Sequence, residues 1–214
     1  LLLRYDGRRW TSLTPASADP AAAVRASAGT RDGALWMGTN GSGLARWQDG
    51  RFTATVSAAD GLPTDVIRAL HVDRVGRLWV GTEGRGLARL DPRAWGESPH
   101  ADASRRVAVV GTSQGLYDEV VHQILADDAG RLWMSSNRGI FRVDEAQLRA
   151  VADGRAARVD AVAYTEHDGL RDREANGGFY PMGIRARDGR LWCPTQGGLV
   201  VVDRNTVPVP LGDV

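Results

Sequence analysis

Residues 171–183, RDREANGGFYPMG, gather the side chains of this sequence that are best suited to bind a small polar ligand. The segment supplies a forked donor, a carboxylate, an amide and two aromatic rings: Arg173, Glu174, Asn176, Phe179 and Tyr180. Such groups together are typical of sites for carbohydrates and other small polar molecules. A structural interpretation stays open beside this one, because Asn176 can shape a turn and Phe179 can fill the centre of the fold.

Catalytic chemistry has little support in the sequence. No two histidines have zinc-like spacing with a nearby carboxylate, and the four are scattered at His71, His100, His122 and His167. The single cysteine, Cys193, excludes an intramolecular disulfide and resembles an inert core thiol. A Gly-x-Ser-x-Gly elbow and a Lys-bearing phosphate loop are both absent. We therefore predict no catalytic residues, no metal and no cofactor, and we expect that this chain is not an enzyme.

The charge balance excludes some classes of partner. The chain has 27 basic residues, all of them Arg, against 26 acidic ones, which gives a formal net charge of +1. No overall field therefore attracts nucleic acid or anionic lipid, and we expect no nucleic-acid partner. No run of residues approaches the ~18 apolar residues that would span a membrane.

One phrase occurs four times along the chain and indicates the fold. The copies are ALWMGTNGSGLARW (34–47), RLWVGTEGRGLARL (77–90), RLWMSSNRGIFRV (131–143) and RLWCPTQGGLVVV (190–202). Their tryptophans are spaced 43, 54 and 59 residues apart, at Trp36, Trp79, Trp133 and Trp192. A Gly-Leu marker precedes each of the last three copies, at 60–62, 114–116 and 168–170. Periods of roughly 40 to 50 residues are typical of propellers and other repeat arrays.

Each repeat has the pattern of four short antiparallel strands. In VIRALHV (66–72) the side chains alternate with a period near two, and Gly-containing turns separate this strand from RLWVGT and LARL. RFTATVS (51–57) and its counterparts supply the fourth strand, and only residues 145–154 suggest a short helix. Four short strands, repeated, predict the blades of a β-propeller. The recurring Trp would then fill the gap between adjacent blades.

We thus predict an all-β protein that is a section of a β-propeller with four-stranded antiparallel blades. About four blades and a partial one are present, as part of a larger propeller of the seven-bladed type. The predicted parts are the tail of a preceding blade at 1–14, blades at 15–57, 58–110, 111–165 (with an insertion at 144–158) and 166–206, and an exit segment at 207–214. The chain is expected to be a fragment, because LRYDGRRWT (3–11) parallels ARWQDGRFT (45–53).

The last repeat departs from the others in one length. The marker leucine and the Trp are 17 residues apart in two repeats but 22 apart in the last, so five residues have been added within 171–183. This segment leads into the first strand of its blade, and we call such a segment a lead-in loop. In a propeller, lead-in loops share a face with the turns between second and third strands, and loops on a rigid scaffold often carry function. Those turns add six candidate ligand-binding residues: Asn40, Glu83, Arg85, Asn137, Arg138 and Gln196.

The stretch DGLPTDVIRALHVDRVGRLWVGTEGRGLARLD resembles the two-component regulator propeller repeat. REANGGFYPMGIRARDGRLWCPTQGGLVVVD (173–203) resembles the closing blades of that family, and NTVPVPLGDV (205–214) resembles its Pro-rich exit. Ala34 in place of Arg, and SSNRG in place of GTxxG, depart from the pattern. The resemblance implies large propellers in the extracytoplasmic sensors of hybrid histidine kinases and diguanylate cyclases, followed by a β-sandwich, a membrane helix and an output domain.

The function that this implies is a ligand-sensing propeller of a membrane-bound two-component receptor, in the periplasmic part of an inner-membrane protein. Its expected partners are an extracellular small molecule or carbohydrate, the downstream β-sandwich and output domains, and a second copy in a homodimer. Two alternatives stay open. A propeller lyase or hydrolase resembling the streptogramin lyases would need a His, a carboxylate and a metal at one site. A protein-binding scaffold would show a large exposed aromatic patch.

Overall fold

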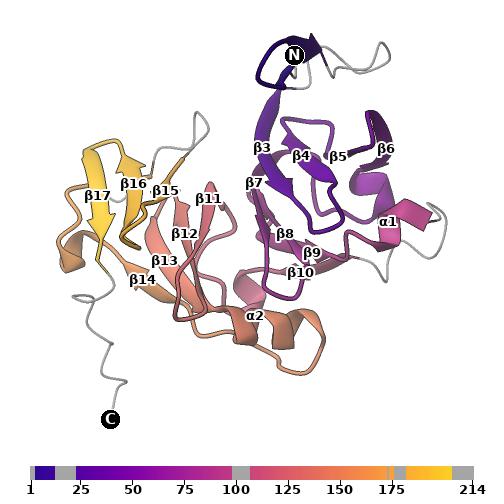
Figure 1. Cartoon of the computed structure of the whole chain (residues 1–214). Coiled ribbons are helices and arrows are strands. Elements are labelled where there is room, and N and C mark those ends of the chain that lie inside the picture. The colour runs from indigo at the N-terminus through magenta and orange to yellow at the C-terminus, as the bar shows by residue number, and fades with distance from the viewer. Residues whose placement is uncertain (1–2, 13–22, 98–106, 173, 176–181, 204–214) are drawn as a thin grey trace. The chain divides into compact units, whose positions relative to one another are not determined.

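The computed structural model describes residues 3–12, 23–97, 107–172, 174–175 and 182–203. Within these residues nearly all regular structure is antiparallel sheet, and the helices are short (Figure 1). After an N-terminal hairpin, four sheets of consecutive strands follow one another along this part of the chain. Consecutive strands in separate small antiparallel sheets are the arrangement of propeller blades, so the predicted all-β propeller fold is confirmed.

The chain folds as two compact units. Unit 1 comprises Leu1–Thr82 and Ala88–Ala108, and unit 2 comprises Glu83–Leu87 and Val109–Val214. The N-terminal hairpin, the first blade and most of the second belong to unit 1, whereas the third and fourth blades belong to unit 2.

Unit 1 begins with the hairpin of β1 (Leu3–Tyr5) and β2 (Trp10–Ser12). Blade 1 has the strand order β3 (Val24–Gly29), β4 (Leu35–Thr39), β5 (Leu44–Gln48) and β6 (Arg51–Val56). Blade 2 has the strands β7 (Ile67–Val72), β8 (Leu78–Thr82), β9 (Leu87–Leu90) and β10 (Val107–Val110). The short helix α1 (Ala94–Glu97) lies in the connection between β9 and β10.

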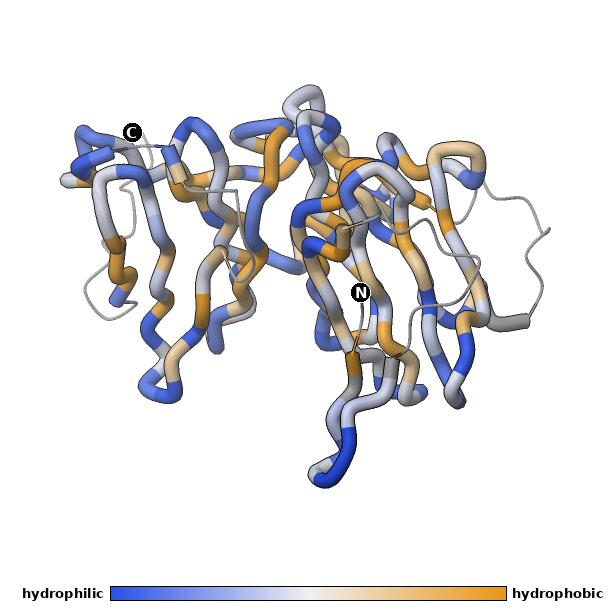
Figure 2. The backbone as a smooth tube through the Cα atoms, turned by 90° about the horizontal axis from the view of Figure 1, so that it is seen from above, coloured by the Kyte–Doolittle hydropathy of each residue, from blue (hydrophilic) through white to orange (hydrophobic). Residues whose placement is uncertain are grey.

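In unit 2, blade 3 has the strands β11 (Gln123–Ala126), β12 (Arg131–Ser136), β13 (Gly139–Asp144) and β14 (Val162–Tyr164). Blade 4 has three strands within the described residues: β15 (Ile184–Arg185), β16 (Leu191–Thr195) and β17 (Gly198–Val202). Figure 2 shows hydrophobic residues along the strands and hydrophilic ones in the turns, as expected for sheets that bury their faces.

The Gly-Leu markers have a local structural cause. Each marker ends a 3₁₀ turn: η1 (Ala58–Asp60), η3 (Thr112–Gln114) and η4 (Glu166–Asp168). The last side chain of each turn accepts a hydrogen bond from the backbone N–H before the turn, as in the 2.9 Å bond from the Ser57 N–H to Asp60. The glycine that follows has φ between 91° and 103°, a left-handed conformation that favours glycine. The marker leucine is then directed inward, and Leu62 and Leu116 are buried.

The recurring Trp fills the gap to the following blade within each unit. In unit 1, Trp36 of blade 1 belongs to a buried cluster with Leu78 and Val80 of blade 2. In unit 2, Trp133 of blade 3 packs with Leu191 and Cys193 of blade 4. The predicted structural role of these tryptophans is therefore confirmed for both pairs, and burial of such large rings supplies much of the free energy that holds the blades together.

Blade 4 has a different environment on its Trp-bearing face. Trp192 is paired with Ile184 on one side and with Val201 on the other, so the three side chains share one face of the sheet. Ile184 and Val201 are exposed and Trp192 is half-buried, whereas the opposite face buries Leu191 and Cys193 against blade 3.

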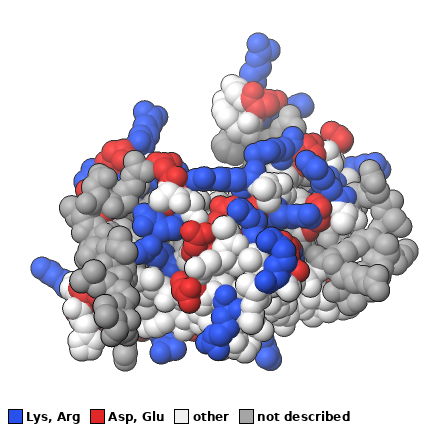
Figure 3. Space-filling model, turned by 90° about the horizontal axis from the view of Figure 1, so that it is seen from below, with Lys and Arg blue, Asp and Glu red and all other residues white. Residues whose placement is uncertain are grey.

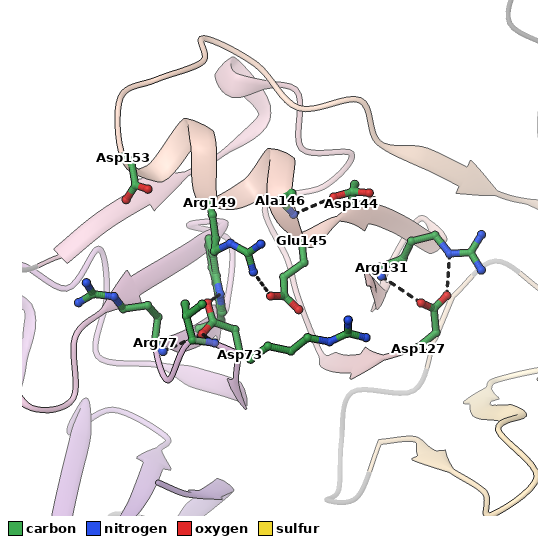
Figure 4. Close-up of polar contacts among 12 residues, drawn as sticks. Asp73, Arg77, Asp127, Arg131, Asp144, Glu145, Ala146, Arg149 and Asp153 are labelled. Atoms are coloured by element: carbon green, nitrogen blue, oxygen red, sulfur yellow. Dashed lines mark hydrogen bonds and ion pairs between the residues drawn. The ribbon is translucent and has the colours of Figure 1, made fainter. Parts of the chain in front are cut away.

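The helix predicted within 145–154 is α2 (Glu145–Ala152), in the connection between β13 and β14. The side chain of Asp144 accepts a 2.7 Å hydrogen bond from the Ala146 N–H, which caps the helix, and buried Glu145 pairs with Arg149 one turn later (Figure 4). None of the helices in the described part of the chain is long and apolar enough to cross a membrane.

Candidate functional site on the lead-in face of unit 2

Lead-in loops and second-to-third-strand turns meet at one end of the blades, which we call the lead-in face. In unit 1 the Gly41 and Gly43 N–H groups donate to the Asp65 carbonyl, at 3.0 and 2.9 Å, so the β4–β5 turn contacts the lead-in loop of blade 2. In unit 2 the Gly86 N–H donates to the Glu119 carbonyl at 2.7 Å, and the Ala175 N–H donates to that of Ser136 at 3.1 Å. Adjacent repeats are thus joined at the face where the sequence predicts ligand binding.

The predicted site residues fall into three groups. Four of the five lead-in residues lie outside the described residues: Arg173, Asn176, Phe179 and Tyr180. Asn40 lies at the lead-in face of unit 1. The remaining residues lie at the lead-in face of unit 2: Glu83, Arg85, Asn137, Arg138, Glu174 and Gln196.

The six predicted residues of unit 2 come from turns and a lead-in loop that lie on the same face. The Gln196 N–H donates to the Glu174 carbonyl at 3.0 Å, which joins the last turn to the lead-in loop of its own blade. Glu174, Gln196, Asn137 and Arg138 are exposed, so their side chains are accessible to a ligand. A contribution to ligand binding stays a prediction for the four residues outside the described part: Arg173, Asn176, Phe179 and Tyr180.

A hollow of about 160 Å³ opens at this face of unit 2. Its lining comes from three loops: Tyr117 from the lead-in loop of blade 3, Arg138 from the β12–β13 turn, and Thr165, Glu166 and His167 from η4 and its N-cap. Among the predicted residues that the structure describes, only Arg138 lines this hollow.

Tyr117 and Arg138 hold each other in place. The Tyr117 hydroxyl donates to the Arg138 carbonyl at 3.2 Å, and the Arg138 Nη1 donates to the Tyr117 carbonyl at 3.3 Å. The Arg138 guanidinium carbon also lies 4.9 Å from the centroid of the Tyr117 ring, which is a cation–π contact. The ring is packed in turn against Phe141, with centroids 5.6 Å apart. These contacts orient an exposed cation and an aromatic side chain before any ligand arrives, which lowers the entropic cost of binding.

The neighbouring amide is also oriented. The Oδ1 of Asn137 accepts a 2.7 Å hydrogen bond from the Nε2 of His122, which is therefore the protonated ring nitrogen in this contact. His122 is buried, so this pair connects the exposed turn to the interior of blade 3. His122 lies just before β11 and not within the strand.

The sequence analysis did not identify four of the residues that line the hollow: Tyr117, Thr165, Glu166 and His167. The available signal was a comparison of the repeats, because Glu166 and His167 replace Ala58 and Ala59 just before the marker, and Tyr117 replaces Pro63 just after it. Unit 2 thus has polar or aromatic side chains at positions where another repeat has small or apolar ones. This difference distinguishes unit 2 as the place for a site.

The described residues show no cluster of side chains suited to bind a metal ion. The described residues contain no group of three or more His, Cys, Asp or Glu that could hold a metal ion. His71 is half-buried in β7, and burial lowers the pKa of its imidazole despite the nearby Asp73 carboxylate.

Figure 3 shows acidic and basic side chains interspersed over the face drawn, in keeping with the small net charge.

Residues 61–84 match the family model described as "Two component regulator propeller". One segment of the chain thus matches the two-component regulator propeller repeat. The match begins at the marker glycine of the second blade and ends in its β8–β9 turn, so it includes the Gly-Leu pair and the Trp-bearing strand.

Solved structures share the propeller fold. An extracellular domain assigned to a hybrid two component system of B. thetaiotaomicron has a TM-score of 0.64 at 20% identity, over 85% of this chain and 22% of that one. Another from the same organism has a TM-score of 0.64 at 23% identity, over 86% and 24%. Virginiamycin B lyase from Staphylococcus aureus has a TM-score of 0.54 at 15% identity, over 90% and 58%.

This chain therefore spans less than a quarter of the length of those extracellular domains. A search of curated proteins found no match. At these identities the likeness establishes the fold, and function has to be argued from the site.

Proposed function

We propose that this chain is part of a sensor propeller that binds a small polar molecule or carbohydrate at the lead-in face of unit 2. The single observation that carries the proposal is the hollow in which Tyr117 and Arg138, fixed by their mutual hydrogen bonds, lie beside the exposed side chains of Glu166 and His167. A cation, a carboxylate, an imidazole and an aromatic ring together can recognise hydroxyl groups and ring faces.

The propeller repeat supports a signalling context for this site. The matching repeat is described as that of a two component regulator, and two similar structures are extracellular domains of such systems. We propose an extracytoplasmic location on a receptor of the inner membrane, with a downstream β-sandwich and a histidine kinase or diguanylate cyclase output, and with a homodimer as the signalling form. In this role the chain binds and transmits and does not catalyse.

The binding proposal is tested by calorimetric titration of the chain with glucose, galactose, maltose, cellobiose and glutamate. At least one of these probes should bind, and Arg138→Ala should weaken its affinity at least tenfold. Arg155→Ala is the matched control, because Arg155 is an exposed Arg of the same unit in the connection between β13 and β14, at the opposite end of blade 3. Equal affinity in both variants, or no binding of any probe, would contradict the proposal.

A lyase function is the second candidate, since Glu166 and His167 pair a carboxylate with an imidazole at the hollow. This function would require turnover of a bound probe. Product formation that His167→Ala abolishes, with probe affinity unchanged, would favour the enzyme over the sensor.

A further inference from the structure

A larger cavity, of about 550 Å³, lies in unit 1 and contains none of the residues predicted from the sequence to bind a ligand. It is lined by Asp32, Arg46, Gln48, Asp49, Arg51, Phe52, Thr53 and Arg93. Asp32 lies in the turn between β3 and β4, and Asp49 in the turn between β5 and β6. Because the strands are antiparallel, both turns lie at the end of blade 1 opposite to the lead-in face. This cavity is therefore separate from the site proposed above.

Arg46 forms the buried part of the lining. Its side chain is 5% exposed, Nη2 pairs with Asp32 Oδ2 at 2.8 Å, and Nη1 donates to Thr53 Oγ1 at 2.8 Å. The Nε of Arg46 is buried and has no hydrogen-bond partner in the described structure. A buried guanidinium is stable only when its charge is offset nearby, so Asp32 is the counter-ion that keeps Arg46 in place.

Asp32 is itself held firmly. Its Oδ1 accepts from the Thr30 hydroxyl at 2.5 Å, and its backbone carbonyl accepts from the Gln48 amide at 2.8 Å. Partial burial raises the pKa of Asp32, but the hydrogen bonds from Thr30 and Arg46 outweigh this effect and hold the pKa below its usual value. Asp32 therefore stays ionised and neutralises Arg46. The net charge of the cavity is then set by the other charged residues of the lining, which are Asp49, Arg51 and Arg93.

Local sequence places Arg51 at the cavity. Asp49 and Gly50 have φ of 50° and 83°, as expected for the two-residue turn that closes a tight hairpin, and this turn pairs Arg51 with Gln48. Arg93 comes from the β9–α1 connection of blade 2. Both arginines are exposed, and neither guanidinium has a hydrogen bond or ion pair with another described residue.

Two unpaired guanidinium groups thus face one cavity, with a paired third at its buried side. Guanidinium groups bind carboxylate, phosphate and sulfate through two parallel hydrogen bonds, and they do so best where water is partly excluded. We propose that this cavity binds a small organic anion through an oxyanion group held by Arg51 and Arg93. Phe52 contributes an apolar surface for the rest of the ligand, and the volume lies within the range of small-molecule sites.

Asp49 opposes such binding and supplies an internal test. Its exposed carboxylate lines the cavity and has no partner among the described residues, so it repels an anion at short range. Removal of this charge should therefore strengthen anion binding, whereas removal of the two arginines should weaken it. Opposite effects from neighbouring residues are hard to obtain by a general change in folding.

The test is titration of the chain with citrate, inorganic phosphate and sulfate, each at low ionic strength and monitored by calorimetry. We expect one-to-one binding of at least one anion, weakened by added sodium chloride as screening increases. Citrate alone would identify a carboxylate ligand, and phosphate or sulfate a tetrahedral one.

The double variant Arg51→Gln/Arg93→Gln should lower the affinity at least tenfold, and Asp49→Asn should raise it about threefold. Arg155→Gln, in unit 2, is the control that removes one exposed positive charge elsewhere and should leave the affinity unchanged. Because Arg51 and Arg93 are exposed and unpaired, their variants should melt at the wild-type temperature. Failure of all three anions to bind, or unchanged affinity in the double variant, would overturn the proposal.

Discussion

The indole Nε1 of Trp133 donates a 2.9 Å hydrogen bond to the Oδ2 of Asp127, six residues earlier in the turn between β11 and β12. Blade 2 repeats the contact, because Trp79 Nε1 lies 3.1 Å from Asp73 Oδ2. The same Asp127 carboxylate also accepts from the N–H groups of Ala129 and Arg131 and pairs with the Arg131 guanidinium, as Figure 4 shows for Arg131. One buried carboxylate thus fixes both the turn and the ring that fills the gap to the next blade.

Blade 1 has Thr30 at the corresponding position, and the Nε1 of Trp36 is buried without a hydrogen-bond partner in the described structure. We therefore predict that Trp133→Phe destabilises the chain more than Trp36→Phe. Both variants lose similar apolar area, but only Trp133→Phe loses a hydrogen bond to a charged group, which contributes about 1.5–3 kcal/mol. Urea unfolding of the two variants measures the difference. Equal losses would show that the indole–carboxylate bond contributes nothing.

The Asp127 carboxylate also predicts a pH dependence. Burial raises its pKa, but hydrogen bonds from Trp133 and Arg131 outweigh burial and hold the pKa below its usual value. The unfolded pKa of Asp is about 3.9. Because the folded pKa of Asp127 is lower, the ionised carboxylate stabilises the fold at pH values above about 3.9, and this stabilisation is lost as the pH falls through the folded pKa. Asp127→Asn should thus be less stable than wild type at pH 7, and the gap should narrow below about pH 4. Thermal melts across this range check the trend, and a constant gap would contradict it.

Two marker glycines provide a matched pair. Gly115 and Gly169 follow equivalent 3₁₀ turns with φ of 91° and 95°. A Cβ at Gly115 would lie 2.3 Å from the Val159 carbonyl oxygen, whereas one at Gly169 would meet no described residue within 4 Å. Gly169→Ala should cost only the left-handed conformation, about 1–2 kcal/mol. Gly115→Ala should cost about 1–3 kcal/mol more, because the backbone must shift. Chemical denaturation compares them, and a larger loss for Gly169→Ala would refute this explanation.

The thiol of Cys193 should be inert in the folded protein. It is buried between blades 3 and 4, and burial raises its pKa to about 12. Ellman's reagent at pH 8 should therefore modify Cys193 only after denaturant is added, with the rate following unfolding. Rapid modification of the native chain would show that blade 4 opens readily from blade 3.

The repeats allowed the fold to be predicted because each of their signals is local. A left-handed glycine, a two-residue hairpin turn and an alternating strand each depend on a few adjacent residues, so four copies of RLW with Gly-rich turns specify blades without knowledge of long-range contacts. The Gly-Leu marker is the clearest case, since the Ser57–Asp60 bond and the Gly61 conformation arise within five residues.

The candidate site was predicted only in part, for a geometric reason. The lead-in face follows from strand alternation, and Arg138 was correctly placed on it. Tyr117 clamps Arg138 from 21 residues earlier, and Glu166 and His167 line the same hollow. Both facts depend on how the loops around blade 3 fold together. The added lead-in residues Arg173, Asn176, Phe179 and Tyr180 remain a prediction.

What the sequence determined by itself is the repeating unit: which segments form strands, where they turn, and which Trp faces a neighbour. What only the tertiary structure decided is which charges meet. Arg46, Arg89 and Arg142 occupy equivalent strand positions, yet Arg46 pairs with Asp32 beside a cavity whereas Arg142 donates to Tyr164. The physical reason is that backbone conformation depends on neighbours in sequence, whereas the partner of a long side chain depends on which strands and turns the folding of its blade brings within its reach.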